Sequence, residues 1–429
     1  MSIGDQRKPG SGGYSASGRL RILLVLTREI PSAPNTGRER TLSFIRRSLA
    51  AKNDISYFQL VSLAHKPRIA RIFKVLLRLL RGMVKKRPCP LQVALFFDGS
   101  DFSSLFRAIV DSHADVVYFD SVRTLDWLVA TRDQFSKLRL ICDFDDLMSH
   151  RFATLLQRQL PISLGYLGSV TPRWLQGFLK RGFVTRKILM YEARSLQQAE
   201  RIAVAAADAV SVVSTADIDR LRADVGPELG AKTWVIPPGV SFPNSSLRTR
   251  SCREFVFVGG DTLLQNRLTI EYLLRLWSIA SPATPLRIIG RMVNSYPPCE
   301  GVTFAGFVDD LGEVYGDDVI ALCPSFIEGG IKTKVLEALG QGVIPVGNAL
   351  TFEGMGCDPG CLAMTNQDIG IFVSDPLPHI KQLRDAAALL RECVYMRYSF
   401  DAVIEAWSRV VSGSRSAIAG AESIGGPPS

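Results

Sequence analysis

The stretch 319–348 constrains the fold more than any other part of this chain. It reads VIALCPSFIEGGIKTKVLEALGQGVIPVGN. An apolar run is followed by a glycine-bearing turn, by a helical pattern that starts at Ile331 with two lysines in its first turn, and by an apolar run at 343–346. In a strand–turn–helix–strand unit, backbone N–H groups and the helix dipole favour an anion at the helix N-terminus. The lysines add full charge, so the unit is predicted to bind phosphate.

Strand and helix signals alternate on both sides of a proline-containing linker at 237–251. The first series predicts strands at 21–27, 55–60, 116–119, 138–142 and 209–213, and helices at 38–50, 68–85, 102–110 and 172–207. The second predicts strands at 255–258, 286–289, 302–305, 319–323 and 343–346, and helices at 267–278, 331–340 and 377–391. Such alternation is typical of parallel sheets that helices cover on both faces.

The length of 429 residues exceeds what one hydrophobic core supports. We therefore expect an α/β protein with two doubly wound, Rossmann-like domains, at 19–236 and 252–394, that face each other across a cleft. The turn at 325–330 follows a strand end, so it should lie on the cleft wall. The tails 1–18 and 413–429 lack apolar periodicity and are expected to be disordered.

The composition excludes several classes of protein. No run of about 18 apolar residues is present, so no membrane-spanning helix is expected. The eight cysteines form no CxxC pair and several lie in apolar runs, which predicts free thiols in a reducing cytoplasm. The four histidines lack metal-ligand spacing, so no metal site is expected.

Several motifs, taken together, resemble those of retaining family 4 glycosyltransferases with the GT-B fold. In the second domain they are FVFVGGDTLLQN (255–266), GVTFAGFVDD (301–310), the 324–348 stretch and FEGM (352–355). In the first domain they are ILLVLTREIPSAPNTGRER, DVVYFDSVRTLDWL, ICDFDDLMSHRF and VIPPGV. The resemblance covers about 20–412 and implies transfer of a hexose-type sugar from a UDP- or GDP-sugar, with retention and without metal or cofactor. It also implies that a helix at 400–412 returns to the first domain.

The resemblance implies particular donor-binding residues in the second domain. Glu337 matches the second of two glutamates that stand eight apart and would bind the ribose diol. The position eight before it is Gly329, and Glu328 lies one residue away. The usual arginine–lysine pair is also missing, and we infer that Lys332 and Lys334 neutralise the diphosphate instead. Alternatively, Lys334 and Glu337 pair on an exposed helix face.

Further residues are expected around the donor. Glu328 and Glu353 flank the predicted phosphate site and would bind sugar hydroxyls, unless they are solvated loop acids. Four glycines are expected to let the backbone approach the donor: Gly259, Gly260, Gly329 and Gly330. In the first domain, Gly37 and Arg38 open a helix after the first strand. Arg38 would meet the diphosphate or an acceptor phosphate, unless it is an ordinary exposed arginine.

Three acids follow the strand at 138–142 on the cleft side: Asp143, Asp145 and Asp146. Relatives carry a histidine where Asp145 stands, so its carboxylate is expected to orient the acceptor hydroxyl or accept its proton. Asp143, Asp146 and Arg151 are expected to contact the acceptor. A metal site is the less favoured interpretation of the three acids. We expect Asp145, Lys332 and Glu328 to form the catalytic set.

A basic stripe, defined by six cations between 68 and 85, is the clearest helical pattern. Its members recur every three or four residues and are Arg68, Arg71, Lys74, Arg78, Arg81 and Lys85. Apolar residues occupy the opposite face, which predicts an amphipathic helix lying on an anionic membrane. A helix packed on its own sheet with a solvated basic face is the alternative. We expect no nucleic-acid partner, because no recognition motif is present.

These observations predict a cytoplasmic hexosyltransferase, peripheral at the inner membrane face, that acts on a lipid-linked or polysaccharide acceptor. Two alternatives stay open. One is a catalytically weak relative that acts as a scaffold in a membrane glycan assembly complex. The other is a nucleotide-sugar epimerase of the same architecture.

Overall fold

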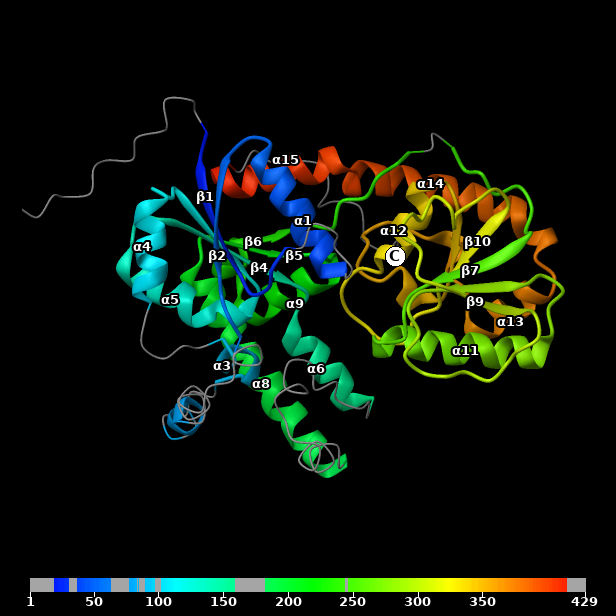
Figure 1. Ribbon diagram of the computed structural model, residues 1–429, viewed down its shortest axis with the longest axis horizontal. Coiled ribbons are helices and arrows are strands. Elements are labelled where there is room, and N and C mark those ends of the chain that lie inside the picture. The colour runs from blue at the N-terminus through cyan, green and yellow to red at the C-terminus, as the bar shows by residue number, and fades with distance from the viewer. Residues whose placement is uncertain are drawn as a thin grey trace, which may run out of the picture.

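The computed structural model describes residues 19–30, 37–62, 77–82, 84, 89–96, 102–158, 182–243 and 246–414. Within these residues the chain forms two lobes, each built on a parallel sheet (Figure 1). The expected two-domain α/β architecture is confirmed. The predicted terminal tails lie outside the described residues, apart from Gly413 and Ser414.

The first domain contains a six-stranded sheet with the order β2-β1-β3-β4-β5-β6 among the described residues. Its strands are β1 (Arg21–Leu26), β2 (Asp54–Gln59), β3 (Val116–Asp120), β4 (Arg139–Asp145), β5 (Ala209–Val212) and β6 (Thr233–Val235). Its helices are α1 (Gly37–Ala50), α3 (Leu91–Ala94), α4 (Ser103–Asp111), α5 (Leu125–Gln134), α6 (Met148–Gln157), α8 (Gly182–Ala206), α9 (Thr215–Val225) and α10 (Pro227–Gly230). The sequence did not predict β6, which is three residues long, or α3, α5, α6, α9 and α10.

The second domain contains a five-stranded sheet with the order β11-β10-β7-β8-β9. Its strands are β7 (Glu254–Val258), β8 (Leu286–Ile289), β9 (Val302–Gly306), β10 (Val319–Leu322) and β11 (Ile344–Val346). Its helices are α11 (Leu264–Ala280), α12 (Thr333–Gly340), α13 (Asn366–Ser374) and α14 (Ile380–Tyr398), and α15 (Phe400–Ser412) follows. Short 3-10 helices lie at Val122–Thr124, Ala349–Thr351, Gly360–Leu362 and Leu377–His379. The predicted start of α12 at Ile331 is wrong, because Lys332 is the N-cap, with a non-helical ψ of 87°.

The first sheet is covered on both faces, as the run of apolar residues in β1 requires. Ile22 and Leu24 point to a core that includes α1 and α15, whereas Leu23 and Val25 point to the core beneath α8. This alternation follows from the two-residue period of a strand. Trp407 of α15 packs against Tyr118 with ring centroids 5.7 Å apart, so the last helix completes the core of the first domain.

Helices α14 and α15 run along one side of both lobes, and α15 lies over the first (Figure 1). The chain crosses at Ser399, which forms an isolated bridge with Val240 of the linker. On the opposite side, α6 and α8 extend away from the sheets. The loops that follow β4, β10 and β11 meet where the lobes face each other, and they carry most of the expected site residues.

Candidate functional site at the domain interface

The loop between β10 and α12 has the glycine conformations that its turn requires. Gly329 and Gly330 have φ angles of +91° and +62°, a region that side chains disfavour. The loop brings Lys332 to the N-cap of α12, where the side chain is only 7% exposed. Its Nζ donates a hydrogen bond of 2.7 Å to the carbonyl of Gly329. Burial lowers the pKa of Lys332, against the effect of the nearby carboxylate of Glu353.

Lys334 points into the interior of the second domain rather than along the helix surface. Its Nζ donates to Oδ1 of Asn266 at 2.9 Å and lies 4.2 Å from the ring centroid of Phe257. Asn266 in turn donates to the carbonyl of Gly260 at 2.9 Å. Burial lowers the pKa of Lys334 to about 8. The lysine therefore lies beside the Gly259–Gly260 turn, and the alternative of a Lys334–Glu337 surface pair is not what the structure shows.

Glu337, one turn further along α12, faces the first domain. Its Oε1 lies 3.4 Å from Nη1 of Arg40 in α1, and its side chain is 25% exposed to solvent. Burial raises the pKa of Glu337, and the cations Arg40 and Lys334 oppose that effect. The carboxylate is therefore at the domain interface and accessible, with a cation beside it.

Glu353 comes from the loop after β11 and reaches the same place. Its Oε2 accepts the N–H of Gly329 at 3.0 Å, and its Oε1 accepts from Nη2 of Arg220 in α9 at 3.1 Å. Burial would raise the pKa of Glu353, but these hydrogen bonds and the Lys332 charge lower it on balance. Gly329 is the residue eight positions before Glu337, and its N–H binds a carboxylate from another loop.

Glu328 has partners of a different kind. It accepts a 2.5 Å hydrogen bond from Nη2 of Arg158, the C-cap of α6 in the first domain, and lies 3.8 Å from Nε2 of His150 within that helix. Arg158 also donates to the carbonyl of Phe326 at 2.5 Å. In this arrangement Glu328 connects the domains, and its carboxylate is already bound by the Arg158 guanidinium.

Arg38 is enclosed by three carboxylates on the first-domain side. Nη2 lies 2.5 Å from Asp120 and 2.9 Å from Asp143, and Nη1 lies 3.1 Å from Asp145. Burial alone would lower the pKa of Arg38, but the carboxylates raise it, so the guanidinium stays charged. Arg38 is therefore a buried cation bound by carboxylates, and the alternative of an ordinary exposed arginine is wrong. Gly37, also expected at the donor, is the first residue of α1.

Asp145 is the exposed member of this cluster. It ends β4 after a register shift and has φ of +65°, a conformation that costs a non-glycine residue energy. Its side chain is 34% exposed, whereas that of Asp143 is 4% exposed. Burial raises the pKa of Asp145 to about 6, with Arg38 opposing and the neighbouring acids adding to the effect. Asp146 pairs with Arg151, so these two expected acceptor residues bind each other.

The Gly259–Gly260 turn is packed against protein. A Cβ on Gly259 would lie 2.8 Å from the side chain of Asn266, and one on Gly260 would lie 2.8 Å from the carbonyl of Arg291. Asp261 follows and accepts the N–H groups of Val293 at 2.7 Å and Asn294 at 2.9 Å. The two glycines thus permit close packing inside the domain. The sequence had suggested a different reason for them, namely close approach of the backbone to the donor.

The basic stripe is described only in part. Residues 77–82 are helical, and four members fall outside the described residues: Arg68, Arg71, Lys74 and Lys85. Arg78 pairs with Asp126 of α5 and is therefore turned toward the protein, contrary to the expected membrane role. Arg81 is exposed. No helix in the described part of the chain is long and apolar enough to cross a membrane.

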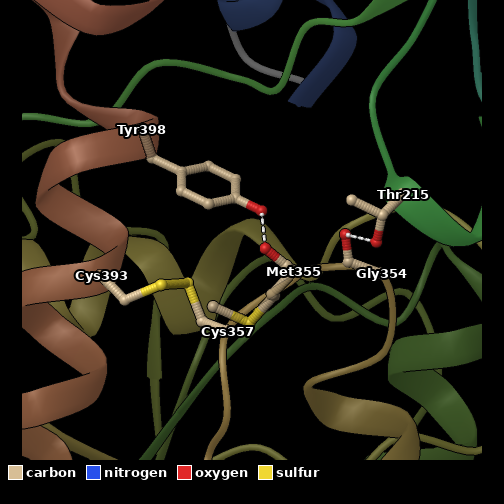
Figure 2. Close-up of a disulfide and its surroundings, with 6 residues drawn as sticks. All are labelled: Thr215, Gly354, Met355, Cys357, Cys393 and Tyr398. Carbon is tan, nitrogen blue, oxygen red and sulfur yellow. Dashed lines mark hydrogen bonds between the residues drawn. A yellow bond between two sulfur atoms is a disulfide. The ribbon is translucent and has the colours of Figure 1, made fainter. Parts of the chain in front are cut away.

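The prediction that the cysteines are all free thiols is wrong for one pair. Cys357 and Cys393 form a disulfide between the loop after β11 and α14 (Figure 2). The sequence spacing of 36 gives no CxxC signal, because the two residues become neighbours only through the tertiary fold. Six other cysteines are free, and three of them are buried in apolar surroundings. Across the described ranges, no group of three or more His, Cys, Asp or Glu side chains could bind a metal ion.

Four residues that bind the expected site residues were not predicted: Arg40, Asp120, Arg220 and Asn266. Asn266 and Asp120 lie within motifs that the sequence displayed, and Arg40 follows Arg38 in the same helical turn. Arg220 had no signal, because its helix α9 was not predicted. Beside the interface, a hollow of about 430 Å³ lies between α6, α8 and α9, and His150 and Arg220 line it.

No family model matches this sequence, and no curated protein matches it. Solved structures do share its fold. Sucrose-phosphate synthase from Thermosynechococcus elongatus superposes with a TM-score of 0.60 at 14% identity, over 92% of this chain and 100% of that one. The lipopolysaccharide outer core galactosyltransferase WaaB gives 0.54 at 12% identity, over 91% and 99%. Anabaena HepE, solved in complex with UDP-glucose, gives 0.54 at 14% identity, over 92% and 100%.

These neighbours are GT-B glycosyltransferases, and the two facing parallel-sheet domains of this chain have the GT-B fold. The fold-class prediction is therefore confirmed. At these identities the likeness establishes the fold and not the reaction.

Proposed function

We propose that this chain is a glycosyltransferase that moves a hexose-type sugar from a UDP- or GDP-sugar to a lipid-linked or glycan acceptor, with retention and without a metal ion. One observation supports the proposal above others. Lys334 and Glu337 lie one turn apart on α12, where the second domain faces the first. A cation for a diphosphate and a carboxylate for a ribose diol are therefore next to each other.

The second domain would bind the donor. Lys334 would neutralise the leaving diphosphate, because it is a desolvated cation beside the α12 N-terminus. Lys332, whose Nζ binds the Gly329 carbonyl, would shape the loop and add charge. Glu337 would accept the ribose hydroxyls. Glu353 would accept sugar hydroxyls with the lone pairs that Gly329 and Arg220 leave unused.

The first domain would bind the acceptor. Asp145 is the carboxylate of the Arg38 cluster that remains accessible, so it would orient the acceptor hydroxyl or accept its proton. Arg38 would fix Asp145 in position through their 3.1 Å ion pair. Glu328, proposed from sequence as catalytic, would instead connect the domains through Arg158.

A peripheral association with the cytoplasmic membrane face is part of the proposal. It is supported by the acid-free run of nine Lys/Arg between 65 and 90, of which Arg81 is exposed. Anionic lipid headgroups attract such cations. Arg78 would not contribute, because it pairs with Asp126.

Calorimetry and hydrolysis with a panel of UDP- and GDP-sugars test the proposal. We expect one nucleotide-sugar to bind and to be hydrolysed slowly, and Glu337→Ala to abolish both. Glu392→Ala removes an exposed carboxylate of α14 and serves as the matched control. Absence of binding by every member would overturn the proposal and favour the scaffold alternative. Conversion of the sugar without any acceptor would favour the epimerase.

A further inference from the structure

The segment Glu353–Cys357 is bound to both domains, by hydrogen bonds on one side and by a disulfide and a hydrogen bond on the other (Figure 2). On the first-domain side, the carbonyl of Gly354 accepts the N–H and the hydroxyl of Thr215, both at 3.2 Å. Arg220, one and a half turns along α9, donates to Glu353 at 3.1 Å. The start of α9 therefore contacts the loop that presents the Glu353 carboxylate.

The other end of the segment is fastened to α14. Cys357 is covalently bound to Cys393, and the carbonyl of Met355 accepts the hydroxyl of Tyr398 at 2.6 Å. Tyr398 is the last residue of α14 and is 2% exposed. Its own carbonyl accepts the N–H of Val240 in the linker at 2.8 Å. The disulfide thus connects the Glu353 loop to the helix end at which the chain crosses between domains.

We propose that the Cys357–Cys393 bond and Tyr398 position Glu353 for the donor sugar, so that the redox state of this pair sets the affinity for a nucleotide-sugar but not for the nucleotide alone. The inference rests on the proposed function. Its physical basis is conformational entropy. The Glu353 carboxylate has a fixed position only if the backbone of its loop is fixed, and the disulfide reduces the conformational freedom of that backbone.

Two of the proposed nucleotide-binding residues, Lys334 and Glu337, are held by contacts outside this segment. Lys334 contacts α11 and β7 through Asn266 and Phe257, and Glu337 contacts α1 through Arg40. None of these contacts involves the segment 353–357. Opening the disulfide should therefore weaken the sugar contacts of Glu353 and leave in place the diphosphate contact of Lys334 and the ribose contact of Glu337.

The chemistry of the switch requires an external dithiol. One thiolate of the dithiol attacks a sulfur of the Cys357–Cys393 bond, which breaks and leaves a mixed disulfide and one cysteine thiolate. The second thiolate of the reductant displaces the other cysteine. Two electrons pass to the protein, the two cysteines take up two protons to become thiols, and the reductant becomes a disulfide. Both cysteines are half-buried rather than enclosed, so a dithiol can reach them.

Calorimetric titration of the full chain with UDP-glucose and with UDP, before and after reduction by dithiothreitol, tests the inference. We expect reduction to weaken UDP-glucose binding about fivefold, the equivalent of one lost hydrogen bond, and to leave UDP binding unchanged. The double variant Cys357→Ser with Cys393→Ser should reproduce the reduced state without reductant. Tyr398→Phe, which removes only the hydroxyl, should weaken UDP-glucose binding by a similar factor in the oxidised chain.

Cys361→Ser is the matched control, because Cys361 is a half-buried free thiol in the same region and should change neither affinity. Equal weakening of UDP and UDP-glucose would indicate general loosening and overturn the inference. Unchanged affinities after reduction would overturn it too, while leaving the proposed function intact. If the oxidised chain binds neither ligand, the proposed function as a UDP-sugar enzyme fails and the inference falls with it.

Discussion

Gly354 is the residue whose replacement tests the contact between the domains most directly. It has φ of +78°, and a Cβ added there would lie 2.7 Å from the Cβ of Ser214 at the N-cap of α9. Gly306 offers a matched control, because its φ is +73° and a Cβ there would meet nothing within 4 Å. Alanine at both positions suffers the same backbone strain, but only at Gly354 does it also meet the other domain.

The magnitudes can be worked from these geometries. An alanine in the left-handed region costs about 1–2 kcal/mol, partly offset by reduced freedom of the unfolded chain. Gly306→Ala should therefore destabilise by about 1 kcal/mol. In Gly354→Ala the α9 start must also move away, and Gly354 then loses its two hydrogen bonds from Thr215, worth about 1 kcal/mol each. The expected total is about 3 kcal/mol.

Urea denaturation of both variants measures the difference, and small-angle scattering reports whether the lobes separate. Because the chain can open instead of unfolding, part of the cost should appear as a larger radius of gyration in Gly354→Ala. Adding Ser214→Gly should restore most of the contact, since glycine at an N-cap costs only a few tenths of a kcal/mol. Equal destabilisation by the two alanines, with no change in scattering, would refute the account.

Four further outcomes are expected. Lys334→Met should raise the KM for the nucleotide-sugar about 10- to 100-fold in steady-state kinetics, and an unaltered KM would exclude the lysine from the donor site. Transfer should fall as pH drops below about 6, because Asp145 must be ionised to accept a proton, and a pH–rate profile of Asp145→Asn should lack that limb. Burial raises the pKa of Glu200 from 4.5 to about 7, so the stability linked to its neutral form is full below pH 4.5 and lost as pH rises through 7. Glu200→Gln should accordingly gain up to about 3 kcal/mol at pH 8 and little at pH 4.5 in denaturation experiments, and a pH-independent gain would contradict this. Arg81→Gln should reduce co-sedimentation with anionic vesicles about fivefold, and unchanged, salt-insensitive partitioning would count against membrane association.

The sequence predicted the strands best where both faces are covered. Residues 116–119 and 319–323 are uninterrupted apolar runs, and both became central strands. The helices α5 and α9 were missed because their apolar positions are diluted by charged residues such as Arg132 and Asp219, which face solvent or neighbouring loops. Local pattern alone does not reveal which side of such a segment is buried.

Site residues could be predicted where they stand close together in one sequence motif. They could not be predicted where distant parts of the chain meet only in the tertiary fold. Lys334 and Glu337 stand in one motif on α12; the structure places Glu337 against Arg40 of the first domain and Lys334 against Asn266 of its own domain. Glu353 and Gly329 are 24 residues apart, and only the fold places that carboxylate on that N–H. The carboxylate partners of Arg38 were not predicted, because Asp120 and Asp143 lie on other strands. Partner choice for a buried charge is thus set by strand order, which one sequence does not reveal.

The packing of α15 on the first domain determines which fragments of the protein can fold. Val403, Trp407, Val410 and Val411 complete a hydrophobic core whose other members lie mainly in β1, β3 and α1. A fragment that stops at the linker would expose Tyr118 and its neighbours to water and should aggregate. An autonomous first half must carry 400–414 on a tether or receive it as a separate peptide, which makes the chain suited to fragment complementation.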